Sequence, residues 1–148
     1  MLTAHASHFG NEVYPGQFTP LFSEEEMIML LNNKLNKDVC HPPVNMIELP
    51  NFYLLEVSIP GVNREDFLIC VNENILSIYV VHAEFEDKGM PTYRMHEFKN
   101  EYFDRHLVLP DKIQIEFITA EYRDGILKIR IPKSNEKSPD LKVKVAVY

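Results

Sequence analysis

Apolar and polar residues alternate with a period of two along most of the chain after residue 42. The alternating runs are rich in Val, Ile, Phe and Tyr, and turn residues such as Pro, Gly and Asn end them. This pattern is typical of short strands with one buried face, and several of them at a spacing of roughly 8–12 residues predict a β-sandwich or barrel. No helical pattern separates the runs, which excludes a parallel, doubly wound sheet. We expect strands within residues 44–49, 53–59, 67–71, 75–81, 102–109, 115–122 and 126–131.

One short segment before the strands shows helical spacing instead. Ser23, followed three residues later by Glu26, forms a capping-box signature, and the acidic residues between them suit the positive end of a helix. The apolar residues that follow at helical spacing are Met27, Ile28, Leu31 and Leu35. The sequence therefore predicts an amphipathic helix over residues 24–36. A helix of this length is too short to be stable alone in water, so it needs a surface to lie on.

These patterns divide the chain into three parts. Residues 1–41 form an N-terminal arm that is irregular apart from the predicted helix, and residues 42–133 form the sandwich. Residues 134–148 form a C-terminal extension, which begins with a polar stretch whose composition is typical of flexible segments.

The extension ends in a further alternating run, in which Val143, Val145 and Val147 occupy every other position. We interpret this run as a peptide that docks in a groove or on a sheet edge, on another subunit, because the linker before it is short for pairing within the same domain. The alternative is that the run forms an additional strand of the same sandwich.

A long polar segment, residues 82–97, separates two of the predicted strands. Loops of this length inside a compact domain usually have a function. Within it, Thr92, Tyr93, Arg94 and Met95 have weak strand character. We therefore expect these four residues to pair with something outside their own sheet.

Composition narrows the range of partners. The 148 residues include 15 Lys and Arg against 22 Asp and Glu, so the formal net charge is −7. This balance argues against duplex DNA or an anionic membrane as the main partner, because phosphate contacts require Lys or Arg. No window contains 18 consecutive apolar residues, and the N-terminus lacks the basic and apolar regions of a signal peptide, so we expect a cytoplasmic protein.

No catalytic or metal-binding constellation is visible in the sequence. The six histidines are dispersed, no glycine-rich phosphate loop is present, and the adjacent Cys40 and His41 lack further ligands nearby. Cys70 falls inside a predicted strand, where a cysteine is usually a small buried hydrophobe. We expect no cofactor, no metal and no enzymatic activity. The alternative of a small hydrolase would need Cys70 paired with a histidine.

Four motifs in register resemble the α-crystallin domain of small heat shock proteins. Residues 120–127 match its Ala-x-x-x-(Asn/Asp)-Gly-(Val/Ile)-Leu signature through Ala120, Gly125 and Leu127. Residues 103–110 resemble its Phe-x-Arg-x-x-x-Leu-Pro motif, which contains Arg105. Residues 55–62 are similar to its strand that runs into a Pro-Gly turn, and residues 74–78 to the next strand. The resemblance covers residues 43–133 and is closest to members of the bacterial type.

The resemblance implies an immunoglobulin-like antiparallel β-sandwich that dimerises and then builds larger homo-oligomers. In bacterial and plant members of the family, a strand in the long loop swaps onto the partner, and here it would be residues 92–95, pairing near residues 44–49 of the other chain. The C-terminal motif would dock in a neighbouring subunit's groove, and either Val143 with Val145 or Val145 with Val147 fits it. The groove would be lined by Phe67, Ile69, Val71, Phe117 and Ile118.

The function implied by the resemblance is ATP-independent holding of non-native client proteins. Exposed apolar side chains on the arm would contact the clients, and methionine suits contacts with varied partners. The same side chains would also suit packing inside the oligomer. A co-chaperone module with the same sandwich is an alternative, although such a module would lack the long loop and the valine tail. The expected client contacts are Phe9, Phe18, Phe22, Met27, Ile28, Leu31 and Leu35.

Overall fold

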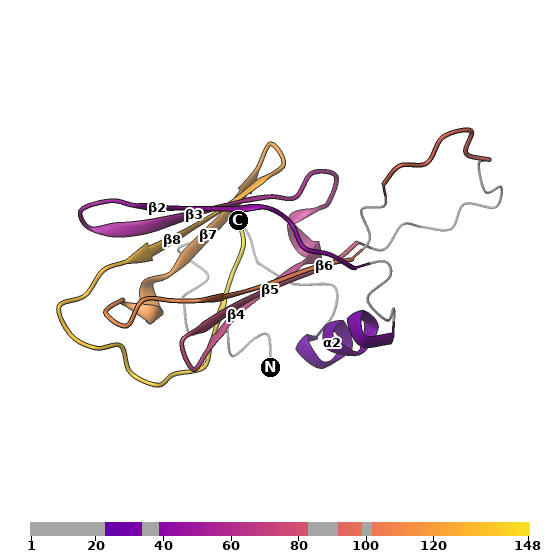
Figure 1. Cartoon of the computed structure of the whole chain (residues 1–148). Coiled ribbons are helices and arrows are strands. Elements are labelled where there is room, and N and C mark those ends of the chain that lie inside the picture. The colour runs from indigo at the N-terminus through magenta and orange to yellow at the C-terminus, as the bar shows by residue number, and fades with distance from the viewer. Residues whose placement is uncertain (1–22, 34–38, 83–91, 99–101) are drawn as a thin grey trace.

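The computed structural model describes residues 23–33, 39–82, 92–98 and 102–148. This part of the chain is built from short strands and one α-helix (Figure 1). The elements are α2 (Glu24–Asn33), β1 (Val39–Cys40), β2 (Val44–Glu48), β3 (Phe52–Ser58), β4 (Phe67–Asn72), β5 (Ile75–Val81), β6 (Tyr102–Val108), β7 (Thr119–Arg123), β8 (Ile126–Pro132) and β9 (Val143–Val145), with single-turn 3₁₀ helices η2 (Arg64–Asp66) and η3 (Ile115–Phe117).

Two sheets stack face to face as a β-sandwich, as the alternating pattern predicts (Figure 1). One sheet has the strand order β1-β6-β5-β4-β9 and the other β2-β3-β8-β7. All neighbouring strands pair antiparallel except the two-residue β1, which runs parallel to β6. The prediction of an antiparallel sandwich is therefore confirmed.

One apolar core fills the space between the sheets. Alternate residues of each strand point into it, so Leu55 and Val57 of β3 face Ile69 and Val71 of β4 across the same cluster. The valines of the C-terminal extension belong to this cluster as well. Each buried aliphatic side chain of this size stabilises the fold by about 1.5–3 kcal/mol relative to exposure.

Two hairpins are closed by two-residue turns in which both residues have positive φ. Glu73 and Asn74 join β4 to β5, and Asp124 and Gly125 join β7 to β8. Such turns match the right-handed twist of the strands, and Gly or Asn tolerates the left-handed backbone best. At the second turn the Gly125 carbonyl also accepts a 2.9 Å hydrogen bond from the Ile59 amide.

The helix α2 begins where the capping box predicts. The Ser23 amide donates to the Glu26 carboxylate at 2.9 Å, and the Glu26 amide donates to Ser23 Oγ at 3.2 Å. The helix lies on the face of the β4–β5–β6 sheet that points away from the core (Figure 1). The described helix spans Glu24–Asn33, and the last three residues of the predicted helix, 34–36, lie outside the described residues.

Two details differ from the expected strands. The two-residue β1 was not expected, because residues 39–40 have no alternating pattern of their own. The strand expected over residues 115–122 begins only at Thr119, since residues 115–117 form a 3₁₀ turn. Ile115 and Ile118 are both buried, and a spacing of three places side chains on one face of a 3₁₀ helix.

Within the described ranges, no helix is both long and apolar enough to cross a lipid bilayer.

Candidate functional site

The strand β2 leaves one edge of the β2-β3-β8-β7 sheet open in the described part of the chain. The Pro43 carbonyl accepts from the Ser58 amide and the Leu49 amide donates to the Phe52 carbonyl, so every second residue between them bonds to β3. Val44, Met46 and Glu48 therefore direct their backbone N–H and C=O groups outward. A row of this kind is a ready template for a further strand.

The described part of the long loop, residues 92–98, extends away from the sandwich (Figure 1). All seven residues are exposed, and none of them forms a strand. Tyr93 is 60% exposed and Met95 77%, and the Tyr93 ring stacks on His96 with the centroids 4.1 Å apart. Large apolar side chains in such positions indicate a contact surface.

The C-terminal extension is docked on its own sandwich. In β9, Val145 pairs with Ile69 and Val143 with Val71 of β4, and all three valines of the extension are buried. Beyond β9 the chain crosses to the other sheet, where Val147 forms a bridge with Ala120 of β7. The Tyr122 amide donates to the Tyr148 carbonyl at 2.8 Å, and the Tyr148 amide donates to the Ala120 carbonyl at 3.2 Å. The extension thus covers an edge of each sheet.

This arrangement differs from the expectation that the linker is too short for the extension to pair within its own domain. The alternative, an additional strand of the same sandwich, is what the structure of the single chain shows. Two hydrogen bonds guide the linker along residues 111–112: the Ser134 amide donates to the Lys112 carbonyl and the Ser138 amide to the Asp111 carbonyl. The linker therefore follows the domain surface and reaches β4.

Four of the five expected groove residues meet the valines of the extension in the core. These four are Phe67, Ile69, Val71 and Ile118. The fifth, Phe117, is 62% exposed because the 3₁₀ turn points it away from the core side occupied by Ile115 and Ile118. The cross-strand register places both Val143 and Val145 on β4 and assigns Val147 to β7.

The helix α2 covers an apolar patch on the outer face of the β4–β5–β6 sheet. Met27 is fully buried there against Leu68 and Val81. Met29, two residues further along, is 61% exposed, and Ile28 is half-buried. Leu31 lies within the helix. The other expected client contacts, Phe9, Phe18, Phe22 and Leu35, lie outside the described residues.

The root of the long loop carries a buried contact between a carboxylate and an imidazole that the sequence patterns did not reveal. Asp66 is 1% exposed, and its Oδ2 lies 2.6 Å from His82 Nδ1, at the residue where the chain leaves β5. The same oxygen accepts a 2.8 Å hydrogen bond from the Asn63 amide. Asp66 and His82 are 16 positions apart, and only the fold brings them together.

Tyr122 lies close to Asp66. Its hydroxyl donates to the Ile59 carbonyl at 2.6 Å, and its ring packs on Phe67 with the centroids 4.9 Å apart. Burial raises the pKa of Tyr122 above its ordinary value of 10.0; a hydrogen bond with the Val62 backbone lowers it, and the charge of Asp66 raises it further.

The signature residues have structural roles. Ala120 and Leu127 belong to the core, and Gly125 forms the β7–β8 turn. Arg105 Nη1 donates to the Pro42 carbonyl at 3.2 Å and so ties β6 to the segment before β2.

A polar cluster lies on the outer face of β5 and β6. His106 Nδ1 lies 2.9 Å from Ser77 Oγ, and the Asp104 carboxylate lies 3.3 Å from His106 Nε2 and 3.0 Å from His41 Nδ1. No group of three or more His, Cys, Asp or Glu side chains in the described residues is suited to hold a metal ion.

Cys70 is buried, with Ser77 and Lys144 as its cross-strand neighbours, so a substrate has poor access to its thiol.

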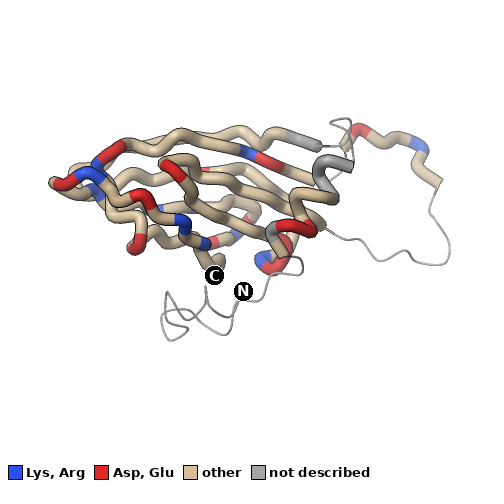
Figure 2. Tube along the Cα trace, turned by 90° about the horizontal axis from the view of Figure 1, so that it is seen from below, with Lys and Arg blue, Asp and Glu red and all other residues tan. Residues whose placement is uncertain are grey.

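Charges of both signs are interspersed over the tube of the chain (Figure 2). The described part of the loop carries one basic and one acidic residue, Arg94 and Glu97.

Comparisons with known proteins agree with this geometry. A family model described as the Hsp20/alpha crystallin family matches residues 45–147, which span the sandwich and the docked extension. Among curated proteins, small heat shock protein C4 of Rickettsia felis is 33% identical over 111 residues, covering 75% of this chain and 68% of that protein.

Solved structures give the same result. A small heat shock protein from Xylella fastidiosa, described as having a distinct high order structure, superposes with a TM-score of 0.57 at 30% identity, covering 66% of this chain and 90% of that chain. The hspA protein of Xanthomonas axonopodis superposes with a TM-score of 0.57 at 28% identity, covering 67% of this chain and 98% of that chain.

Proposed function

Because this chain belongs to the Hsp20/alpha crystallin family of small heat shock proteins, we propose that it is an ATP-independent holdase, which binds unfolding proteins and prevents their aggregation. The observation that carries the proposal is the family match over residues 45–147. The exposed Tyr93 and Met95 of the loop, the open edge of β2 and the apolar face of α2 supply surfaces for binding other chains without any chemistry.

The first assembly step is a dimer in which residues 92–95 of one copy add to the edge of β2 in the other. Two observations support this step. The outward backbone groups of Val44, Met46 and Glu48 match the needs of an incoming strand. Tyr93 and Met95 are the large exposed side chains that such a strand would bury.

Larger oligomers form when the C-terminal extension of one subunit docks in the groove of another. The support is the groove itself, because β4 and β7 accept Val143, Val145 and Val147 with the correct register and bury all three. The same contacts serve a neighbour's extension, since the groove residues are identical in every subunit of a homo-oligomer.

Clients bind to the N-terminal arm, including the apolar face of α2. In the single chain, Met27 packs this face of the helix against Leu68 and Val81 on the sheet. A client that binds the same helix face must displace it from the sheet. The arm residues that we assign to clients are Phe9, Phe18, Phe22, Met27, Ile28, Leu31 and Leu35.

The test is to heat a model client with and without the protein, without nucleotide, while recording light scattering and oligomer mass. We expect full-length protein to suppress scattering. Deleting residues 1–41 should leave a folded dimer with little activity, since the deletion removes only the two-residue edge strand β1 from the sandwich while the client contacts are lost. If the truncated protein protects the client as well as the full chain, the assignment of the arm is wrong. If the full chain does not protect the client, the proposed holdase function is wrong.

A further inference from the structure

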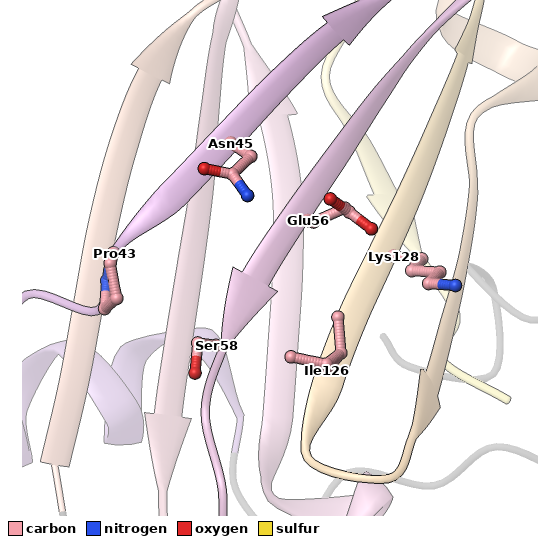
Figure 3. Close-up of a pocket in the computed structure, with 6 residues that line it drawn as sticks. All are labelled: Pro43, Asn45, Glu56, Ser58, Ile126 and Lys128. Carbon is pink, nitrogen blue, oxygen red and sulfur yellow. The ribbon is translucent and has the colours of Figure 1, made fainter.

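The outer face of the β2-β3-β8-β7 sheet is hollowed next to its open edge (Figure 3). The hollow has a volume of about 290 Å³, large enough for the end of one long side chain. Its lining mixes apolar and polar groups and comes from three adjacent strands and the residue before β2. The lining residues are Pro43, Asn45, Glu56, Ser58, Ile126 and Lys128.

Glu56 lies at the centre of this hollow and has no ion-pair partner in the described part of the chain. Its cross-strand neighbours are Asn45 on β2 and Lys128 on β8. In Figure 3 the ammonium group of Lys128 points away from the Glu56 carboxylate, while the amide of Asn45 points into the hollow. The acidic group next to the open edge is thus available to a cation that arrives with an added strand.

Alternation along the loop decides which side chain arrives there. In an extended strand, Tyr93 and Met95 point to one face and Arg94 to the other. The core-side face of β2 presents Met46, which is partly exposed although its cross-strand partner Leu55 is fully buried. Tyr93 and Met95 bury the most apolar area if they lie on the core-side face, beside Met46. Because side chains alternate along a strand, Arg94 then lies on the outer face.

The charges on the outer face then select the register. If Arg94 pairs with Asn45, its cross-strand neighbours on the outer face, after Asn45 itself, are Glu56 on β3 and then Lys128 on β8. If Arg94 paired with Ile47 instead, two residues along β2, its neighbours on the outer face would be Leu54 and Arg130. That position has no acidic group to pair with Arg94, and Arg130 carries the same charge. Strands lie about 4.8 Å apart, so Arg94 and Glu56 would be separated by about 10 Å between their Cα atoms, a span that these two long side chains bridge.

We propose that Arg94 of a second copy lies beside Asn45 in this hollow and forms an ion pair with Glu56. The inference rests on the proposed pairing of residues 92–95 with β2 and adds its face, its register and its charge determinant. In a symmetric dimer the ion pair occurs twice, so a small energy per pair becomes a measurable effect on partner choice.

A mixing experiment with two charge reversals tests the ion pair. The E56R homodimer and the R94E homodimer each contain two like-charge contacts, whereas their heterodimer restores two opposite-charge contacts. The exchange of one E56R homodimer and one R94E homodimer into two heterodimers converts four like-charge contacts into four opposite-charge contacts. At about 0.5 kcal/mol for each contact, the equilibrium constant of this exchange should be about 30-fold larger than the value for random mixing. Native mass spectrometry of isotopically distinguishable chains measures the proportion.

The matched control replaces E56R with E116R, which reverses an exposed acid on η3, outside the hollow. Mixing E116R with R94E should give the same heterodimer proportion as mixing wild type with R94E. If E56R and R94E mix no better than this control pair, the ion pair is wrong.

The double variant Y93D/M95D separates this inference from the pairing on which it rests. We expect it to abolish the dimer, because two charges would enter the apolar face. A dimer that depends on Tyr93 and Met95 but ignores Glu56 and Arg94 overturns only the register. A Y93D/M95D dimer of wild-type affinity overturns the loop pairing itself, and the register with it.

Disulfide trapping provides a second measurement that does not depend on charge. In chains in which Cys40 and Cys70 are replaced, N45C/R94C should form an intermolecular disulfide under mild oxidation. N45C/Y93C should not, because Tyr93 points to the opposite face. Equal yields from the two pairs would contradict the proposed face.

Discussion

Val145 and Ile69 are directly paired across β9 and β4, and each side chain is almost completely buried by the contact and the core beneath it. The pair joins the last strand of the chain to an edge that the rest of the domain leaves unpaired. The stability of the extension on the sandwich therefore depends on a few aliphatic side chains, and the first prediction follows from this contact.

Replacing Val145 with Asp should release the extension while the sandwich stays folded. An unpaired carboxylate in an apolar site costs several kcal/mol, more than the few contacts of β9 supply. The Tyr122 amide, which donates to the Tyr148 carbonyl, should then exchange with solvent much faster. Hydrogen exchange resolved by residue measures this effect. The control L141D, placed just before β9 at a side chain that is already 37% exposed, should leave the Tyr122 amide protected.

Charging all three valines tests the role of the extension in assembly. The variant V143D/V145D/V147D should form particles no larger than dimers, because its extension can no longer enter any groove. Light scattering gives the particle mass. An unchanged mass would show that the extension does not link dimers into larger assemblies.

Met27 and Met29 form a matched pair of probes on α2. Met27→Ala should weaken the seating of the helix by about 2–3 kcal/mol, because it removes a fully buried side chain over Leu68 and Val81. Met29→Ala should have little effect, since that side chain is mainly exposed. Binding of a hydrophobic dye reports the uncovered patch. Equal dye binding by the two variants would contradict the packing.

The Asp66–His82 pair should contribute to the stability of the sandwich. His82→Ala leaves the buried Asp66 carboxylate with the Asn63 amide as its remaining hydrogen-bond donor among the described contacts, so the free energy of unfolding should fall by about 2–4 kcal/mol. Urea denaturation measures the change. His96→Ala, on an exposed part of the loop, is the control and should change the value by less than about 0.5 kcal/mol. A loss no greater than that of the control would mean the pair is not stabilising.

Tyr122→Phe should alter how stability depends on alkaline pH. Because burial raises the pKa of Tyr122 in the folded chain, the unfolded chain releases this proton first as the pH rises above 10.0, and the folded state loses stability there. Phenylalanine removes that loss. At neutral pH the substitution should cost about 1 kcal/mol, since the Ile59 carbonyl loses its donor, and the deficit should shrink above pH 10.0. A deficit that grows with pH would contradict the raised pKa.

Local patterns predicted the sandwich well because strand alternation, turn residues and caps are written into neighbouring positions. The Ser23–Glu26 capping box and the Asp124–Gly125 turn are examples, and both have the expected geometry. The 3₁₀ turn at residues 115–117 was missed because Ile115, Phe117 and Ile118 fit alternation and a spacing of three almost equally well.

Contacts that depend on three-dimensional proximity were not visible in the sequence. The Asp66–His82 pair and the hollow around Glu56 each combine residues from separate strands. The docked extension was misjudged for a different reason, since the route of its linker depends on hydrogen bonds to residues 111–112. The expected cytoplasmic location and the assignment of the arm residues to clients stay predictions.

The short linker between Lys133 and β9 also affects whether a groove binds the extension of its own subunit or that of a neighbour. An extension tethered by so few residues is present at its own groove at an effective concentration in the millimolar range, which dilution does not change. A neighbour's extension must outcompete it, and its chance of doing so rises with the concentration of subunits. A subunit that leaves an assembly can therefore refill its own groove, so exchange between particles need not expose bare strand edges to the solvent.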